Sequence, residues 1–316
     1  MLLKSAIQIA SPSGSSAALS ILIFHRVLPR PDPLFPGEVD SAMFDRLIRW
    51  VTQWFNIVPL ERAMSLLREG KLPARAAAIT FDDGYADNLL YAAPILKKYS
   101  VTATFFIATG FLDGGRMWND TVIESVRKAA AHELDARFLD LGKLAIGGTE
   151  QKRSALACLI PAIKHLPSAE RADAVNRIAA SCAAELPQDL MLTSAQLQEL
   201  RLMGMGIGAH TVNHPILAKT DRDQAQREIA ESRDFLQSLL GERIGLFAYP
   251  NGRYLSDYTD DHATIVRNLG FDAAVSTNPG VSRKDTDPYQ LRRFTPWDRT
   301  RGRFGLRLLL NCIQSR

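Results

Sequence analysis

Two short motifs in this 316-residue chain contain the residue types that bind a metal ion and move protons. The first is Asp82-Asp83, which directly follows a short apolar segment. The second pairs His210 with His214, again directly after an apolar segment. Two histidines four residues apart can meet one ion in a helical or tightly turned segment, and a carboxylate completes three protein ligands. Such a set leaves coordination positions open for water and substrate, as catalytic metal sites require.

Each motif also has a purely structural interpretation. An Asp-Asp-Gly sequence often forms a turn that caps the next helix, and the histidine pair is compatible with the start of a helix. Adjacent residues of an extended segment point to opposite sides, so Asp82 and Asp83 need not share one role. The elements that precede the two motifs therefore bear on the choice between these interpretations.

The segments around the motifs alternate between apolar strands and amphipathic helices. We expect strands at 19–24, 76–81, 102–108, 207–209, 246–249 and 273–276, and helices at 41–55, 60–69, 88–99, 222–240 and 259–269. This order predicts parallel pairing and an α/β fold. The carboxyl ends of parallel strands converge on the active site in α/β barrels, so we expect both motifs at one rim.

Four segments make up the predicted organisation. Residues 1–18 are predicted to be a flexible lead-in, because residues 11–16 are rich in serine and contain proline and glycine. Residues 19–300 are predicted to form the barrel. A helical insertion rich in alanine, glutamate and arginine interrupts it at about 120–203. Residues 301–316 form a basic amphipathic segment.

The positive charge of the chain is concentrated near its C-terminus. Lysine and arginine total 38 against 34 acidic residues, a net charge of +4. From Leu291 onward there are seven arginines and one acidic residue, Asp298, which gives this segment +6. We therefore expect no nucleic-acid-binding surface over the body of the protein. Segment 301–316 is interpreted either as a final helix packed on the body or as a peripheral contact with an anionic membrane.

The composition, with 46% hydrophobic and 23% charged residues, is typical of a soluble globular protein. The apolar run 17–24 is too short to span a membrane. His25 and Arg26 follow it where a signal peptide would have small residues. Three widely spaced cysteines exclude a disulfide framework and a cysteine-rich zinc module. We expect a protein of the cytoplasm or of the periphery of the inner membrane.

Three motifs resemble a known family. Thr-Phe-Asp-Asp-Gly at 80–84, His-Thr-x-x-His at 210–214 and Phe-Ala-Tyr-Pro-Asn-Gly at 247–252 resemble the first three motifs of polysaccharide deacetylases with NodB homology, carbohydrate esterase family four. The resemblance extends from about Leu19 to Pro296. The segment Ile-Phe-His-Arg-Val near the start, together with the second motif, is similar to deacetylases of bacterial exopolysaccharide clusters.

The resemblance implies an irregular (β/α)7-type barrel that hydrolyses N-acetyl, and sometimes O-acetyl, groups on a polysaccharide or oligosaccharide. It implies that Asp82 is the general base. It also implies that Asp83, His210 and His214 bind a divalent metal, most often zinc. The metal polarises the acetyl carbonyl and lowers the pKa of water, and a base then takes the remaining proton.

The chain departs from the family pattern at two positions. The family's third motif usually begins with an arginine that orients the base, and Ala248 stands there. Arg292 or Arg293 is a candidate replacement from another direction. The usual acid is a histidine in a Leu-x-x-His motif, and segment 290–294 contains none. His25 follows the first predicted strand, and we weigh a role as proton donor against a structural role.

Several residues are candidates for substrate contact. A backbone N–H near Tyr249 and Asn251 is expected to stabilise the oxyanion. Trp118, at the start of the predicted insertion, is a candidate to stack on a sugar ring, as are Tyr254 and Trp297. Each of these aromatic residues is equally well explained as part of the core or its rim.

Two other functions remain open from the sequence. Related proteins cleave small cyclic amides or imides, although a helical insertion that lines an open groove suits a polymer better. The missing acid motif and Ala248 also fit a barrel that binds a glycan without turnover. A base placed beside three metal ligands has no use in a binding module, so Asp82 favours an enzyme.

Overall fold

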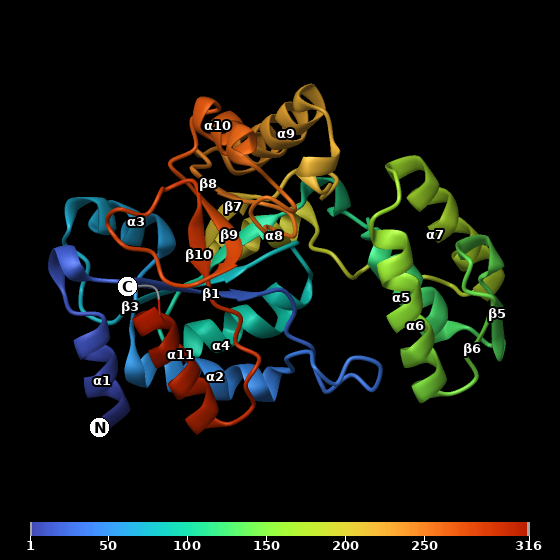
Figure 1. Ribbon diagram of the computed structural model, residues 1–316, viewed down its shortest axis with the longest axis horizontal. Coiled ribbons are helices and arrows are strands. Elements are labelled where there is room, and N and C mark those ends of the chain that lie inside the picture. The colour runs from blue at the N-terminus through green and yellow to red at the C-terminus, as the bar shows by residue number, and fades with distance from the viewer. Residues whose placement is uncertain (1, 315–316) are drawn as a thin grey trace. The chain divides into compact units, whose positions relative to one another are not determined.

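A parallel β-sheet lies at the centre of the larger of two units in the computed structural model, which describes residues 2–314 (Figure 1). In spatial order its strands are β1 (Leu19–Phe24), β3 (Ala76–Phe81), β4 (Thr104–Ile107), β7 (Gly206–Ala209), β8 (Leu246–Ala248), β9 (Ala273–Pro279) and β10 (Leu291–Arg293). The short strand β2 (Asn56–Ile57) pairs with β3. Each of these pairs is parallel, as the alternating pattern predicts.

The two ends of this strand order meet. The backbone N–H of Phe294, just after β10, donates to the Ile21 carbonyl at 2.7 Å, and the Ile23 N–H donates to the Phe294 carbonyl at 3.1 Å. Both bonded partners are in β1, so the sheet nearly closes into a barrel. Closure brings residues of β10 next to the carboxyl ends of β1 and β3.

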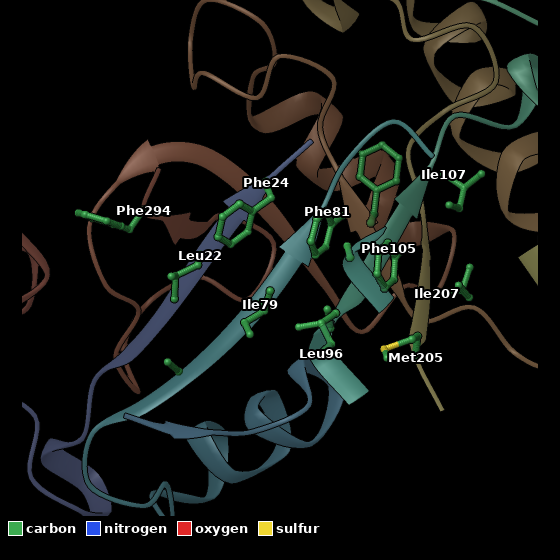
Figure 2. Packing of buried hydrophobic residues seen from close by; sticks show 14 of the residues in the cluster. Leu22, Phe24, Ile79, Phe81, Leu96, Phe105, Ile107, Met205, Ile207 and Phe294 are labelled. Carbon is green, nitrogen blue, oxygen red and sulfur yellow. The ribbon is translucent and has the colours of Figure 1, made fainter. Parts of the chain in front are cut away.

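The strands are apolar because both faces of the sheet are covered. Every residue of β1 and β3 is buried, which explains continuous apolar runs in place of alternation. Figure 2 shows side chains of one core cluster along β1, β3, β4 and β7. The ring of Phe81 lies 5.4 Å from that of Phe24 and 4.7 Å from that of Phe105, so three neighbouring strands share one aromatic stack.

Helices and short helical turns connect these strands. The helices of this unit are α1 (Leu2–Ala10), α2 (Ser41–Trp54), α3 (Leu60–Glu69), α4 (Ala93–Lys98), α8 (Ser194–Leu202), α9 (Arg222–Leu240), α10 (Asp260–Asn268) and α11 (Arg301–Gln314). The turns are η1 (Gly14–Ser16), η2 (Asn88–Ala92), η3 (Thr109–Phe111) and η5 (Leu217–Lys219). The predicted helix 88–99 begins as the π-turn η2. Asp221 caps α9 by accepting from the Gln224 N–H, and Gly241 ends that helix in the left-handed region.

The second unit consists of residues 30–38 and 114–191 and has a separate hydrophobic core. It contains α5 (Trp118–Lys128), α6 (Thr149–Lys164), α7 (Ser168–Cys182), the turn η4 (Arg137–Leu139) and the antiparallel strands β5 (Glu133–Asp135) and β6 (Lys143–Ala145). Arg127 on α5 donates to Asp32 at 2.9 and 2.6 Å, which ties the two stretches of sequence together. The insertion is predicted at about 120–203, whereas this unit begins at 114, ends at 191 and also includes the separate stretch 30–38.

The predicted flexible lead-in contains a helix. Ile7 and Ala10 of α1 are buried, and Ser11 exchanges hydrogen bonds with the Ala18 backbone. The N-terminal segment is therefore ordered by tertiary contacts that its serine-rich sequence does not predict. At the other end, α11 buries Phe304 and Leu308, as the packed-helix interpretation of 301–316 predicts. Among the described residues, no helix has the length and apolar character needed to cross a bilayer.

Candidate active site

Asp83, His210 and His214 meet at the carboxyl ends of two strands. Asp83 follows β3, and both histidines follow β7. The Oδ1 atom of Asp83 lies 3.4 Å from Nε2 of each histidine, and the three candidate ligand atoms lie within 4.8 Å of one another. Asp83 and His210 are buried, and His214 is partly exposed. One side of the cluster is therefore accessible.

The cluster fits a divalent metal ion on three counts. Oδ1 of Asp83 and Nε2 of His210 are buried and have no hydrogen-bond partner, whereas buried polar atoms are normally satisfied. Nitrogen and oxygen ligands at about 2.0–2.2 Å from a tetrahedral ion lie about 3.3–3.5 Å apart, which matches both carboxylate–imidazole distances. Carboxylate and imidazole are also a donor set that zinc accepts.

Contacts around the two histidines determine which of their ring nitrogens can bind a metal. Nδ1 of His210 lies 2.7 Å from the carbonyl of Ala248 in β8. A carbonyl only accepts, so Nδ1 carries a proton and Nε2 is the ring nitrogen left to bind a metal. Burial lowers the pKa of His214 to about 4, against the opposing charge of Asp83. His214 is therefore neutral near pH 7, as a metal ligand must be.

The loop that carries the histidines is strained and held from outside. Thr211 and His214 have φ values of 63° and 52°, a region that side-chain-bearing residues seldom adopt. Glu228, buried on α9, accepts from the N–H groups of Val212 at 2.9 Å and Asn213 at 2.8 Å, and from the Asn213 side chain. Glu228 therefore fixes the loop between the two candidate ligands.

Asp82 lies beside this cluster and has a different partner. Its two carboxylate oxygens accept from Nη1 and Nη2 of Arg293, each at 2.7 Å. Both side chains are almost completely buried, and Arg293 also donates from Nε to the Ser276 carbonyl at 2.7 Å. Burial raises the pKa of Asp82, but the charge of Arg293 and the hydrogen bonds that it donates outweigh burial and hold that pKa below its usual value. Asp82 is therefore an ionised carboxylate in a fixed orientation.

Arg293, rather than Arg292, is the arginine that contacts Asp82. The sequence leaves both arginines open, with Arg292 among the expected site residues. Side chains alternate along β10, so Arg292 is exposed while Leu291 and Arg293 are buried. Arg293 reaches Asp82 because the sheet nearly closes. It thus occupies the place of the arginine that the family pattern has at the position of Ala248.

Comparison with known proteins identifies the family. The family model described as polysaccharide deacetylase matches residues 69–143 and 167–274, more than half of the chain. The chain belongs to the polysaccharide deacetylase family. The YxkH protein of Bacillus subtilis is 23% identical over 279 residues, which cover 88% of this chain and 71% of that protein.

A second relative is the poly-beta-1,6-N-acetyl-D-glucosamine N-deacetylase of Staphylococcus aureus strain MSSA476. It is 29% identical over 142 residues, which cover 42% of this chain and 48% of that enzyme. This match therefore spans about half of the staphylococcal protein.

Two solved structures share the fold. The Streptococcus pyogenes deacetylase PplD, in complex with acetate, superposes with a TM-score of 0.62 at 22% identity over 94% of this chain and 98% of that chain. IcaB from Ammonifex degensii gives a TM-score of 0.61 at 19% identity over 96% and 98% of the respective chains. At these identities the likeness establishes the fold, and the predicted (β/α)7-type barrel of the deacetylase family is confirmed.

His25 lies near the two aspartates of this deacetylase fold. It follows β1, its side chain is exposed, and its carbonyl accepts from Nδ2 of Asn88 at 2.9 Å. A positive charge on its imidazole would lower the pKa of both Asp82 and Asp83, so the ring lies near the two carboxylates. The proton-donor role of His25 stays a prediction.

Tyr249 is buried in the core. Its ring stacks on that of Tyr258 at 3.8 Å, and its hydroxyl donates to the Tyr289 carbonyl at 3.0 Å. Its backbone N–H donates to the Val275 carbonyl at 3.2 Å, so neither polar group is available for an oxyanion. Asn251 is half-buried in a left-handed turn, and its expected oxyanion contact stays a prediction.

Trp118 begins α5 of the second unit. The ring is half-buried against that unit's core, and the guanidinium carbon of Arg171 lies 5.8 Å from its centroid. These contacts support a packing role inside the unit. Stacking of Trp118 on a sugar stays a prediction.

Two positioning residues, Glu228 and Arg293, were thus not assigned from the sequence. Glu228 follows the second motif by fourteen residues and sits within an ordinary helical pattern, where an acidic residue carries no signal. The sequence could not decide between Arg292 and Arg293 as the partner of Asp82. Strand β10 is only three residues long, and its register shifts between Leu291 and Arg293.

Proposed function

We propose that this chain is a metal-dependent hydrolase that removes N-acetyl groups from a polysaccharide or oligosaccharide, with Zn²⁺ as the ion. One observation carries the proposal: three candidate ligands converge beside an ionised carboxylate that has its own buried arginine. A metal site without a base would be sufficient for binding. The base next to the ligands supports hydrolysis.

Asp83, His210 and His214 would hold the ion. When bound, the ion polarises an acyl oxygen and lowers the pKa of water from 15.7 towards about 7. A base that assists such a water need not be strong. The lowered pKa of Asp82 therefore does not conflict with its proposed role.

Asp82 accepts a proton from the attacking water while the water oxygen forms a bond to the acetyl carbon. Each carboxylate oxygen has two lone pairs, so the bidentate contact with Arg293 leaves acceptor positions open. Arg293 fixes the orientation of the carboxylate. As the C–N bond breaks, the leaving amine takes a proton, and we assign its donation to His25.

Poly-N-acetylglucosamine is the polymer class that we propose as substrate. A staphylococcal relative that carries this substrate in its name supports the assignment. An enzyme of small cyclic imides and a glycan-binding barrel without turnover are the competing functions.

The test is acetate release from oligomers of β-1,6-linked N-acetylglucosamine, before and after chelation and after Zn²⁺ is restored. We expect release that chelation abolishes and zinc restores. An O-acetylated sugar and a cyclic imide are assayed in parallel. Ring opening of the imide without acetate release would favour the small-molecule function, and oligomer binding without turnover of any substrate would favour the binding module.

A further inference from the structure

Two helices near the ends of the sequence lie side by side at one edge of the sheet unit. Figure 1 shows α1 and α11 adjacent and running in the same general direction. Leu3 packs over Gly305, where Trp54 and Leu3 together leave no room for a Cβ atom. Ile7 and Phe304 are completely buried. The inner faces of both helices are therefore part of the core.

The outer faces of these helices are apolar as well. Leu2 and Ile9 of α1 are separated by seven residues, and Leu306, Leu310 and Ile313 of α11 are spaced by four and three, so each set lies on one helix face. The exposed fractions are 89% for Leu2, 75% for Ile9, 53% for Leu306, 39% for Leu310 and 45% for Ile313. A single exposed leucine is ordinary, but five exposed apolar side chains on two adjacent helices are a candidate binding surface. We call these five residues the outer stripe.

Basic residues accompany the outer stripe. Between them, α1 and α11 contain Lys4, Arg301, Arg303 and Arg307 and no aspartate or glutamate. The side chain of Arg303 is 84% exposed, and its Nε lies 3.8 Å from the Asp298 carboxylate. The acidic residue next to α11, Asp298, is buried and accepts from Arg307 at 2.6 Å, so it offers little negative charge to a partner.

Apolar residues flanked by lysine and arginine are the composition of helices that lie in the interface of an anionic bilayer. The two helices have 9 and 14 residues, fewer than the roughly 20 that a membrane span requires. A second copy of the chain is a poorer occupant. Its own basic residues would be brought against these, and like charges in contact oppose association.

We propose that α1 and α11 form a docking surface for an anionic membrane, with the outer stripe inserted at the boundary between headgroups and acyl chains. The basic side chains then lie at the level of the lipid phosphates. This proposal does not depend on the proposed chemistry, because none of these residues belongs to the candidate active site.

The test is flotation of the full chain with vesicles of phosphatidylcholine alone and of phosphatidylcholine mixed with phosphatidylglycerol. We expect binding to the mixed vesicles that weakens as salt is added, because salt screens the basic residues. The triple variant Leu2→Ser, Leu306→Ser, Leu310→Ser should bind at least about ten-fold more weakly, since it removes three of the five apolar side chains that insert into the bilayer. Leu202→Ser, which removes a fully exposed leucine on α8, is the matched control and should bind as the wild type does.

Circular dichroism and urea unfolding establish that the variants are folded. No binding of the wild type to mixed vesicles, or equal binding of the triple variant, would overturn the proposal. Sedimentation equilibrium provides a second readout. A dimer that forms in the wild type and disappears in the triple variant would assign the outer stripe to self-association instead.

Discussion

Asp82 and Asp83 are neighbours in sequence, yet their carboxylates have different partners. Asp82 forms a bidentate pair with Arg293, while Asp83 faces two imidazoles. The alternation of side chains along an extended segment predicts that two adjacent residues point in different directions. Asp83 also leaves the extended conformation, with a φ of 77°. The sequence could therefore predict that the two roles differ. It could not predict which arginine serves Asp82.

Loss of Arg293 should leave a buried charge without a partner. Arg293→Met is expected to lower the free energy of unfolding by about 3–5 kcal/mol, because the Asp82 carboxylate stays buried. The double variant Asp82→Asn, Arg293→Met should recover part of that loss. Urea unfolding measures both, with Arg292→Met as the exposed control of equal chemistry. A change below about 1 kcal/mol in Arg293→Met would contradict the buried ion pair, since that is the range of exposed pairs.

His25 should affect turnover more than binding. His25→Ala is expected to lower kcat by about 10²–10⁴-fold, the range of a general acid, while KM changes little. Steady-state acetate release measures the split. His165→Ala, which removes an exposed histidine at the end of α6, should leave both constants unchanged. An unchanged kcat in His25→Ala would assign His25 a structural role.

At the scale of elements, the candidate site depends on a loop that secondary structure alone does not define. The six predicted strands and most helices follow from apolar periodicity, because strands such as β1 and β3 are buried along their whole length. The loop after β7 is different. Glu228 holds Val212 and Asn213, which lie between the loop's two left-handed residues, and such a tertiary contact leaves no pattern in the sequence.

Removal of the Glu228 carboxylate should weaken metal binding without touching a ligand. Glu228→Leu leaves the N–H groups of Val212 and Asn213 without acceptors, so the His210–His214 loop loses its fixed shape. We expect zinc affinity to fall by about 10–100-fold, the usual effect of a partner outside the ligand set. Competition with a chromogenic chelator measures the affinity. Glu231→Leu, at an exposed position of α9, is the matched control, and equal affinities in the two variants would refute the role of Glu228.

At the scale of the whole molecule, two units with separate cores share one chain. Residues 30–38 join the second unit through the contact of Asp32 with Arg127, 95 positions away. A contact between segments so far apart is set by tertiary structure, which explains why the predicted insertion missed this stretch. The N-terminal helix α1 was missed for the same reason, since Ile7 is buried only through the assembled fold.

A core change in the second unit should stay confined to it. Leu159→Ala removes a completely buried side chain and is expected to cost that unit about 2–5 kcal/mol. Hydrogen exchange should rise within 114–191 while zinc content is unchanged, because the candidate ligands belong to the other unit. Faster exchange throughout the chain together with loss of zinc would show that the units unfold as one.

The most direct test of the metal-dependent reaction is zinc content measured together with acetate release in the wild type, Asp83→Ala and Asp82→Asn. We predict stoichiometric zinc and acetate release in the wild type, and neither in Asp83→Ala. Asp82→Asn should retain zinc yet lose about 10²–10⁴-fold in rate, because only the base is removed. Asp83→Ala that keeps both stoichiometric zinc and wild-type acetate release would contradict the account.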